Sequence, residues 1–146
     1  MSDCQNGLCE VRFLLPCVYL RNIYFSQEWF ATLAGNESYK PTYRFQYFIT
    51  LNGGKLWKRA PYHNSSIKTL NDGGIIFDLN QTDNKAAYSL DEGNTYYRFN
   101  IFNDDEIIID GRILGSAKNE RLLIFARNLN KSVIAIAHVD FTNILS

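Results

Sequence analysis

The sequence predicts an all-β protein assembled from short antiparallel strands, and three observations support this fold class. Aromatic residues make up 14% of the 146 residues, with nine Tyr and ten Phe, and aromatic side chains favour strands. Short apolar or alternating runs recur along the chain and are separated by turn residues, for example Asn71-Asp72-Gly73-Gly74. In addition, one turn pattern occurs twice, at a spacing typical of a four-stranded repeat.

The two copies of this pattern, here called the repeated turns, read Ser/Thr, any residue, Asp/Asn, any residue, Gly, two further residues and an aromatic. The second copy is Ser89-Leu90-Asp91-Glu92-Gly93-Asn94-Thr95-Tyr96, and the first is Thr50-Leu51-Asn52-Gly53-Gly54-Lys55-Leu56-Trp57. An Asp or Asn side chain accepts N–H bonds within its own turn, and Gly takes the positive φ that a tight hairpin requires. The pattern is the Asp-box, or BNR repeat, and it predicts a structural role for eight residues: Thr50, Asn52, Gly54, Trp57, Ser89, Asp91, Gly93 and Tyr96.

The spacing of the repeated turns indicates the architecture. They begin at Thr50 and Ser89, 39 residues apart, close to the roughly 40–45 residues of a four-stranded propeller blade. We therefore expect antiparallel four-stranded blades of a β-propeller, about two to three of them, with residues 1–146 forming one partial propeller segment. Its open sheet edges need either the remaining blades or self-association to cover them.

The N-terminal part, residues 1–42, is expected to be partly strand and partly irregular. Residues 8–20 contain one or two strands interrupted by Pro16. Residues 28–33 allow a short helical turn, but an irregular loop is the preferred interpretation. Residues 43–65 then form the end of a first blade, because 43–50 alternates aromatic and polar residues as a half-buried strand does. The first repeated turn follows, and residues 55–59 lead out of it.

Residues 66–102 are expected to form a complete blade. Its four strands are predicted at 67–70, 75–79, 85–89 and 96–102, with the second repeated turn joining the last two. Residues 103–146 are expected to form a last blade that lacks its fourth strand. The three strands of that blade are predicted at 107–114, 121–127 and 132–141.

Composition and charge exclude several classes of partner. Lys plus Arg and Asp plus Glu are equal at 15 each, so no general electrostatic attraction to nucleic acid or to an anionic membrane is expected. No apolar run approaches the roughly 20 residues of a membrane span, so we expect no membrane insertion by this segment. Residues 11–20 make a poor signal peptide because Arg12 and Pro16 interrupt the apolar run.

The cysteines and the glycosylation sequons give information on the cellular compartment of the protein. Cys4 and Cys9 flank the turn pair Asn6-Gly7, so a disulfide-closed hairpin is geometrically plausible, and the alternative is that these two and Cys17 are reduced thiols. The cysteine spacing matches no zinc pattern, and no metal or other cofactor is expected. The four sequons begin at Asn36, Asn64, Asn80 and Asn130, near predicted loops or strand ends. Four sequons favour a secreted or luminal setting over a cytosolic one.

Catalytic motifs are missing from the sequence, and no catalytic residue is expected. There is no helix-opening Gly-rich loop, no GxSxG and no HExxH. The run Asp104-Asp105-Glu106 is interpreted as a solvated turn, and His63 and His138 as surface or hydrogen-bonded histidines. One enzymatic alternative remains open, since a sialidase binds its substrate's carboxylate with three converging arginines. The residues that could serve are Arg98, Arg112, Arg121 and Arg127.

From residue 49 to the C-terminus, the sequence resembles the last blades of the luminal propeller in the sortilin family of sorting receptors. The resemblance is carried, in order, by Ile49 to Trp57, by Ile67-Lys68-Thr69-Leu70-Asn71-Asp72-Gly73-Gly74-Ile75-Ile76, by Tyr88-Ser89-Leu90-Asp91-Glu92-Gly93, and by Ala137-His138-Val139-Asp140-Phe141-Thr142-Asn143-Ile144-Leu145. Within this resemblance Asn52 replaces the box Asp and Tyr96 replaces Trp. Cys4 and Cys9 correspond to a cysteine pair that the family carries a blade earlier.

The resemblance implies a non-enzymatic segment of a sorting receptor that binds peptides or proteins for Golgi–endosome transport. It also implies a luminal or extracellular location in a membrane receptor of the Golgi, endosomes and plasma membrane. No ligand-binding residue of the family can be carried over to a position in this chain. The alternatives are a fragment of a sialidase-like Asp-box glycoside hydrolase, and a free-standing secreted β protein that self-associates.

Overall fold

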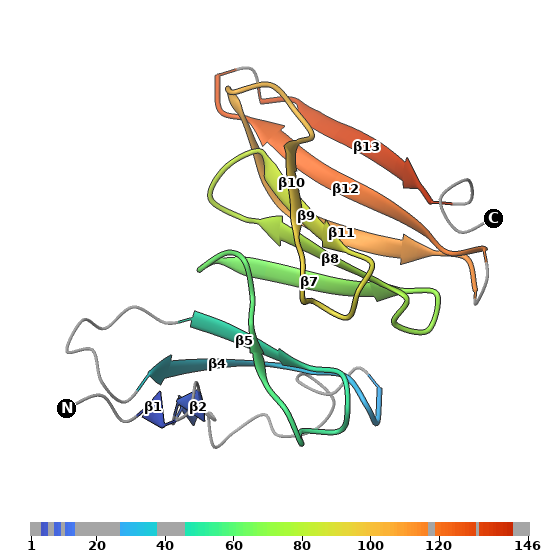
Figure 1. Cartoon of the computed structure of the whole chain (residues 1–146). Helices are drawn as coiled ribbons and strands as arrows, with labels where there is room; N and C mark the ends of the chain where they lie inside the picture. Colours follow the sequence, from blue (N-terminus) through green and yellow to red (C-terminus); the bar gives the residue numbers. More distant parts are fainter. Residues whose placement is uncertain are drawn as a thin grey trace, which may run out of the picture. The chain divides into compact units, whose positions relative to one another are not determined.

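The structure is a computed structural model, and it describes residues 4–5, 8–9, 11–13, 27–37, 46–116, 119–130 and 132–141. The chain falls into two compact units, Met1–His63 and Asn64–Ser146. In the described residues these units consist of antiparallel strands and turns without an α-helix, so the all-β prediction is confirmed (Figure 1).

The first unit contains a two-stranded and a four-stranded sheet. Its strands are β1 (Cys4–Gln5), β2 (Leu8–Cys9), β3 (Val11–Phe13), β4 (Ala31–Glu37), β5 (Gln46–Thr50) and β6 (Lys58–Arg59). β1 pairs with β2, and β3 to β6 are neighbours in chain order, which makes the larger sheet an antiparallel meander. The predicted strands at 8–20 and 43–50 are confirmed where β2, β3 and β5 lie, and their remaining residues fall outside the described ones.

The preferred interpretation of residues 28–33 as an irregular loop is confirmed for 28–30, which belong to no strand, and was wrong from Ala31, where β4 begins between β3 and β5. Ala31 and Leu33 are buried at 0% and 6% exposure, and the alternate residues Thr32 and Ala34 are half-buried. The alternation of a strand is therefore present, but in small residues. The next residue in the strand is Gly35. A side chain does not fit at this position, because a Cβ there would lie 2.9 Å from the Arg12 carbonyl oxygen of β3.

The second unit contains a four-stranded and a three-stranded sheet. Its strands are β7 (Ser65–Leu70), β8 (Ile75–Asn80), β9 (Lys85–Ser89), β10 (Tyr97–Asn100), β11 (Glu106–Leu114), β12 (Arg121–Asn128) and β13 (Ile134–Asp140). β7 to β10 form one meander and β11 to β13 another. All seven strands predicted for residues 66–146 are confirmed, with ends displaced by no more than two residues. β7 already includes Ser65, which the sequence had assigned to the preceding segment.

The two sheets of the second unit pack face to face around one apolar core. β8 and β9 supply residues from one sheet, and β11 and β12 supply residues from the other. The fully packed members are Leu70, Ile75, Phe77, Leu79, Ala86, Ile108, Leu122, Ile124 and Phe141. Because side chains alternate along a strand, each sheet commits one face to this core and leaves the other face outside it.

Candidate functional site

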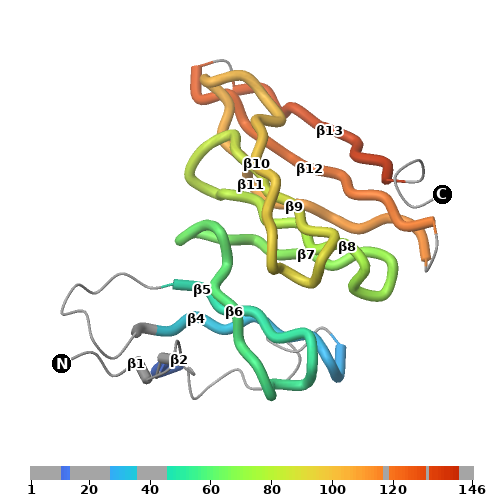
Figure 2. The backbone as a smooth tube through the Cα atoms, in the orientation of Figure 1, coloured from blue at the N-terminus to red at the C-terminus, as the bar shows by residue number. Residues whose placement is uncertain are grey.

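The two repeated turns occupy the same place in two different sheets. The first joins β5 to β6, and the second joins β9 to β10, so each connects the third and fourth strands of a four-stranded meander (Figure 2). Thr50 is the last residue of β5, and Ser89 is the last residue of β9. The two turns are therefore equivalent in topology as well as in sequence.

The hydrogen bonds within the two turns are also equivalent. The Thr50 hydroxyl accepts from the Gly54 N–H at 2.9 Å and donates to Asn52 Oδ1 at 3.0 Å, and Asn52 Oδ1 accepts from the Leu56 N–H at 2.9 Å. In the second turn, the Ser89 hydroxyl accepts from the Gly93 N–H at 2.9 Å and donates to Asp91 Oδ1 at 2.8 Å. Each turn thus uses one hydroxyl and one side-chain carbonyl or carboxylate oxygen to satisfy its inward-facing N–H groups.

In the second turn, the carboxylate of Asp91 has a pKa well below its ordinary value. Hydrogen bonds from the Thr95 N–H, the Thr95 hydroxyl and the Ser89 hydroxyl lower the pKa of Asp91 to about 2 from its ordinary value of 3.8. Gly93 follows with a φ of 77°, in the left-handed region that glycine adopts without strain. The carboxylate is therefore charged at any physiological pH and is engaged in holding the turn, which leaves it no proton to transfer.

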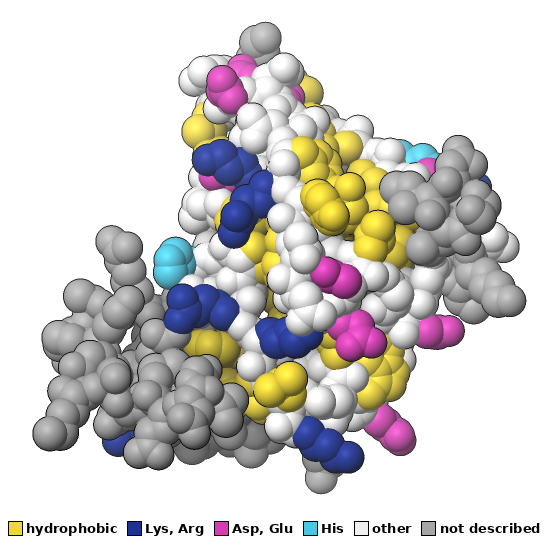
Figure 3. Space-filling model, in the orientation of Figure 1, with side chains coloured by type: hydrophobic (Ala, Val, Ile, Leu, Met, Phe, Trp, Pro, Cys, Tyr) yellow, Lys and Arg dark blue, Asp and Glu magenta, His cyan; other side chains and the backbone are white. Residues whose placement is uncertain are grey.

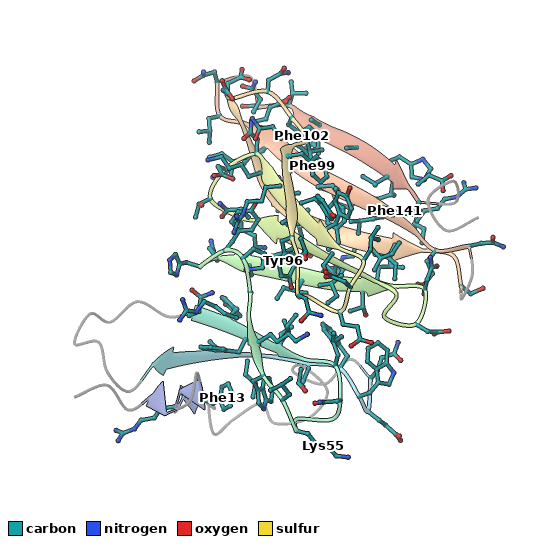
Figure 4. All side chains as sticks on the ribbon, in the orientation of Figure 1. Phe13, Lys55, Tyr96, Phe99, Phe102 and Phe141 are labelled. Atoms are coloured by element: carbon teal, nitrogen blue, oxygen red, sulfur yellow. The ribbon has the colours of Figure 1, made fainter. Side chains whose placement is uncertain are left out.

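The aromatic residue that ends each pattern differs between the turns. In the first, Trp57 donates its indole N–H to the Gly54 carbonyl at 3.1 Å and packs against Phe13 with ring centroids 4.6 Å apart. In the second, Tyr96 lies directly before β10 (Figure 4) and is half-buried. Burial together with the charges of Asp78 and Asp91 raises the pKa of its hydroxyl. Both aromatics pack as structural groups.

The predicted glycosylation and disulfide positions lie on strand ends and turns. Asn64 is exposed immediately before β7, and Asn130 is exposed between β12 and β13. Asn80 ends β8, and its Oδ1 accepts from the Thr82 hydroxyl at 2.7 Å. Asn36 lies in β4, and the structure describes only its backbone. The register places Cys4 opposite Cys9 across β1 and β2, while Cys17 falls outside the described residues, so the disulfide stays a prediction.

The acidic run at 104–106 makes separate contacts. Asp104 Oδ1 accepts from the Asn84 amide at 3.3 Å, Asp105 Oδ2 from the Asn128 amide at 2.6 Å, and Glu106 Oε2 from the Asn103 N–H at 3.0 Å. Each carboxylate thus bonds a different amide, in agreement with the turn interpretation. Among the residues that the structure describes, no three His, Cys, Asp or Glu side chains come together as a metal site would require.

The four arginines proposed for a sialidase-like site do not all come together. Arg112 contacts Asp110 at 3.7 Å, and Arg121 contacts Asp140 at 3.7 Å. Arg127 lies six residues beyond Arg121 on β12, which corresponds to about 20 Å along a strand. Arg121 and Arg127 therefore cannot converge on one carboxylate. The fourth, Arg98, lies on β10 in the other sheet of the second unit.

An open cavity of about 640 Å³ lies on the outer face of the β11–β13 sheet, and sequence reasoning had missed it. Its lining residues are Leu114, Gly115, Asn119, Arg121, Leu123 and His138. The strand registers bring them together, because Leu114 lies opposite Arg121 and Leu123 lies opposite His138. No local motif marks a cavity whose walls come from three strands, although the alternation of Arg121, Leu123 and Phe125 does indicate a shared face.

The cavity is lined by two leucines and by the polar side chains of Arg121, His138 and Asn119. Leu123 is half-buried, Leu114 is 47% exposed, and the Arg121 side chain is 52% exposed. The Arg121–Asp140 ion pair at 3.7 Å is open to water on both sides, and such pairs are worth only about 0–1 kcal/mol. The guanidinium is therefore available to a ligand carboxylate, next to leucines that can hold an apolar group.

Comparison with known proteins finds a partial similarity to a protein sorting factor. No family model matches the sequence. The chain is 30% identical over 99 residues to the vacuolar protein sorting/targeting protein 10 of Debaryomyces hansenii, a match that covers 66% of this chain and 6% of that protein. In the described residues no helix is long and apolar enough to cross a membrane. Over about two thirds of its length, the chain is thus similar to a small part of a protein named for vacuolar sorting and targeting.

Proposed function

We propose that this chain is a non-enzymatic, ligand-binding segment of the luminal propeller of a sortilin-like sorting receptor, which binds peptides or proteins for Golgi–endosome transport. The observation that carries the proposal is the equivalence of the two repeated turns. Both join the third and fourth strands of a four-stranded meander and share the same hydroxyl, acceptor and glycine bonds. A repeated four-stranded unit with this turn is what a blade of an Asp-box propeller requires.

The similarity to a sorting and targeting protein supports the receptor class within that architecture. We propose a luminal setting, to which the four sequons and the Cys4–Cys9 pair would both be suited. In this proposal residues 1–65, 66–102 and 103–146 belong to successive blades of a larger propeller.

The cavity beside Arg121 is the proposed ligand contact on this segment. A peptide group that carries both a carboxylate and an apolar side chain fits its chemistry, since Arg121 would hold the carboxylate and Leu114 and Leu123 the apolar part. His138 lies opposite Leu123 on β13 and adds a second hydrogen-bond donor at the same place. We therefore expect preference for acidic or C-terminal apolar residues over basic peptides.

Peptide binding to the purified full chain tests this function. A library of fluorescent peptides varied in charge and in C-terminal residue is screened by polarisation. We expect saturable binding of carboxylate-bearing apolar peptides and a loss of about tenfold in affinity for Arg121→Ala, which removes a charge-assisted bond. Arg127→Ala is the matched control, because Arg127 is exposed on the same strand but does not line the cavity. Equal losses in both variants, or no bound peptide, would contradict the proposal.

A further inference from the structure

Glu120 connects the two sheets of the second unit at the edge of the cavity. It lies directly before β12, between the cavity residues Asn119 and Arg121, and its Oε2 accepts from the Asn71 N–H at 2.5 Å. Asn71 begins the turn at residues 71–74, which joins β7 to β8 in the other sheet. A charge-assisted bond thus links the start of β12 to a turn 49 residues earlier in the chain.

The β7–β8 turn is a well-fixed support for this bond. Leu70, the last residue of β7, is fully buried in the core. Asn71 and Asp72 both have a φ of 52°, and Gly73 has a φ of 90°. Successive residues in the left-handed region are typical of tight hairpin turns, for which Asn, Asp and Gly are the favoured residue types. The Asn71 N–H is therefore held in one direction, toward Glu120.

Arg121 depends on its two neighbours for its place in the cavity. It is the first residue of β12, and strand ends open more readily than strand centres. Its register partners, Leu114 and Asp140, are the last residues of β11 and β13 and lie at strand ends themselves. On one side of Arg121, Leu122 is fully buried in the core. On the other side, Glu120 is held by its bond to the β7–β8 turn.

The same bond anchors one wall of the cavity. Gly115 and Asn119 both line the cavity, and they approach closely, because a Cβ at position 115 would lie 2.5 Å from the Asn119 carbonyl oxygen. Gly115 has a φ of 91°, a left-handed conformation that glycine adopts without strain. The chain passes from Asn119 directly to Glu120. Holding Glu120 in place therefore fixes the end of this wall as well as Arg121.

The charge of Glu120 by itself opposes the binding of a carboxylate. Figure 3 shows acidic side chains gathered over the β7–β8 turn and the second repeated turn. The exposed acids of these two turns are Asp72, Asp91 and Glu92. A further carboxylate next to Arg121 weakens the attraction of the site for an anion, since like charges repel. Glu120 therefore cannot assist a ligand carboxylate through its charge, and its bond to the β7–β8 turn is what it can contribute.

We propose that Glu120 is a positioning residue of the cavity: through its bond to Asn71, it holds the Arg121 guanidinium where a ligand carboxylate binds. The inference rests on the proposed function, because it assigns Glu120 a role in that same cavity. A guanidinium discriminates a carboxylate from an amide only when its donors are held in place. Selectivity for a carboxylate over the corresponding amide should therefore depend on Glu120.

Two fluorescein-labelled peptides test this role, Gly-Ser-Gly-Ser-Ile with a free C-terminal carboxylate and the same peptide as its C-terminal amide. Their binding to the purified full chain is measured by anisotropy. Glu120→Ala should weaken binding of the carboxylate peptide about tenfold and leave the amide peptide unchanged. Glu120→Gln keeps an oxygen acceptor for the Asn71 N–H and should keep the selectivity. If Glu120 acted only through its charge, both variants would instead bind the carboxylate peptide more tightly than the wild type.

Glu106→Ala is the matched control. Glu106 is half-buried at the start of β11, and its Oε2 also accepts a backbone N–H, that of Asn103 at 3.0 Å. Because it lies at the end of β11 remote from Leu114, its replacement should leave the selectivity unchanged. Retained selectivity in Glu120→Ala, or an equal loss in Glu106→Ala, would overturn this inference alone. A wild type that binds both peptides equally, or neither, would overturn the ligand contact proposed at Arg121 and this inference with it.

Discussion

Gly111 of β11 lies against Leu79 of β8 so closely that a Cβ at position 111 would be 2.7 Å from Leu79 Cδ1. The same atom would be 3.2 Å from Leu122 Cδ1. Both leucines are fully buried, so the space cannot be gained by moving a side chain into solvent. The contact thus sets how closely the two sheets of the second unit approach, and only glycine allows that approach.

Gly111→Val should destabilise the second unit by about 1–3 kcal/mol, the usual cost of overpacking a core. Chemical denaturation of the wild type and the variant measures the difference. Arg112→Val, at the next position, is the control, because the Arg112 side chain is 74% exposed and its bond to Asp110 is a surface ion pair. If the two variants are equally stable, the sheets do not meet at Gly111.

Asp91→Ala should lower the melting temperature by about 5 °C, because the N–H groups of Asn94 and Thr95 lose their acceptor. Asp91→Asn should retain most of the stability, since Asn52 performs the same role with an amide oxygen in the first repeated turn. Thermal unfolding of the three proteins checks the order. A normal melting temperature for Asp91→Ala would show that the turn is not held by this side chain.

The pH dependence of stability should reveal the same carboxylate. The pKa of Asp91 is lowered to about 2 in the folded protein, so its contribution is fully present above the ordinary value of 3.8 and is lost as pH falls toward 2. The stability difference between the wild type and Asp91→Asn should therefore shrink between about pH 4 and pH 2 and stay constant from pH 5 to 7. Urea midpoints at each pH give this difference, and a difference that is independent of pH would exclude a shifted Asp91.

Expression with a cleavable secretory signal tests the proposed luminal setting. Asn64 and Asn130 are exposed, so both should carry glycans, and digestion with an endoglycosidase should increase the mobility of the secreted protein. Asn64→Gln and Asn130→Gln should each reduce the change in mobility on digestion by the contribution of one glycan. A secreted protein whose mobility does not respond to digestion would argue against glycosylation at these sites.

A fluorogenic sialoside distinguishes the receptor proposal from the glycoside hydrolase alternative. We expect no hydrolysis above background, because Arg121 and Arg127 lie at opposite ends of β12 and cannot jointly bind one carboxylate. The free-standing chain and its Arg121→Ala variant are assayed side by side. Hydrolysis by the parent that Arg121→Ala abolishes would establish the enzymatic alternative.

Local patterns were sufficient to predict much of the second unit. Residues 75–79 and 85–89 could be recognised as strands because apolar residues are bounded there by Asn-, Asp- and Gly-containing turns. The repeated turns could be placed between strands because their chemistry is contained within eight residues. Hydrogen bonds that span two to four residues depend on residue types close together in the sequence, so the pattern that forms them can be recognised from the sequence alone.

Features that depend on pairing between distant residues could not be predicted. β4 was missed because its alternation is carried by Ala31 and Leu33 and is followed by Gly35, and glycine in a strand has meaning only once the neighbouring strand is known. The cavity beside Arg121 was missed because its register partners lie on β11 and β13.

The two repeated turns also bear on how such repeats diverge. Thr50 with Asn52 and Ser89 with Asp91 build the same bonds, although neither pair of residues is identical and only one carries charge. Both turns retain an oxygen acceptor two residues after a hydroxyl. Asp can therefore be replaced by Asn after a unit has been duplicated. A search for ancestral copies in longer reading frames should therefore require a hydroxyl, an amide or acid, and a glycine, rather than an aspartate.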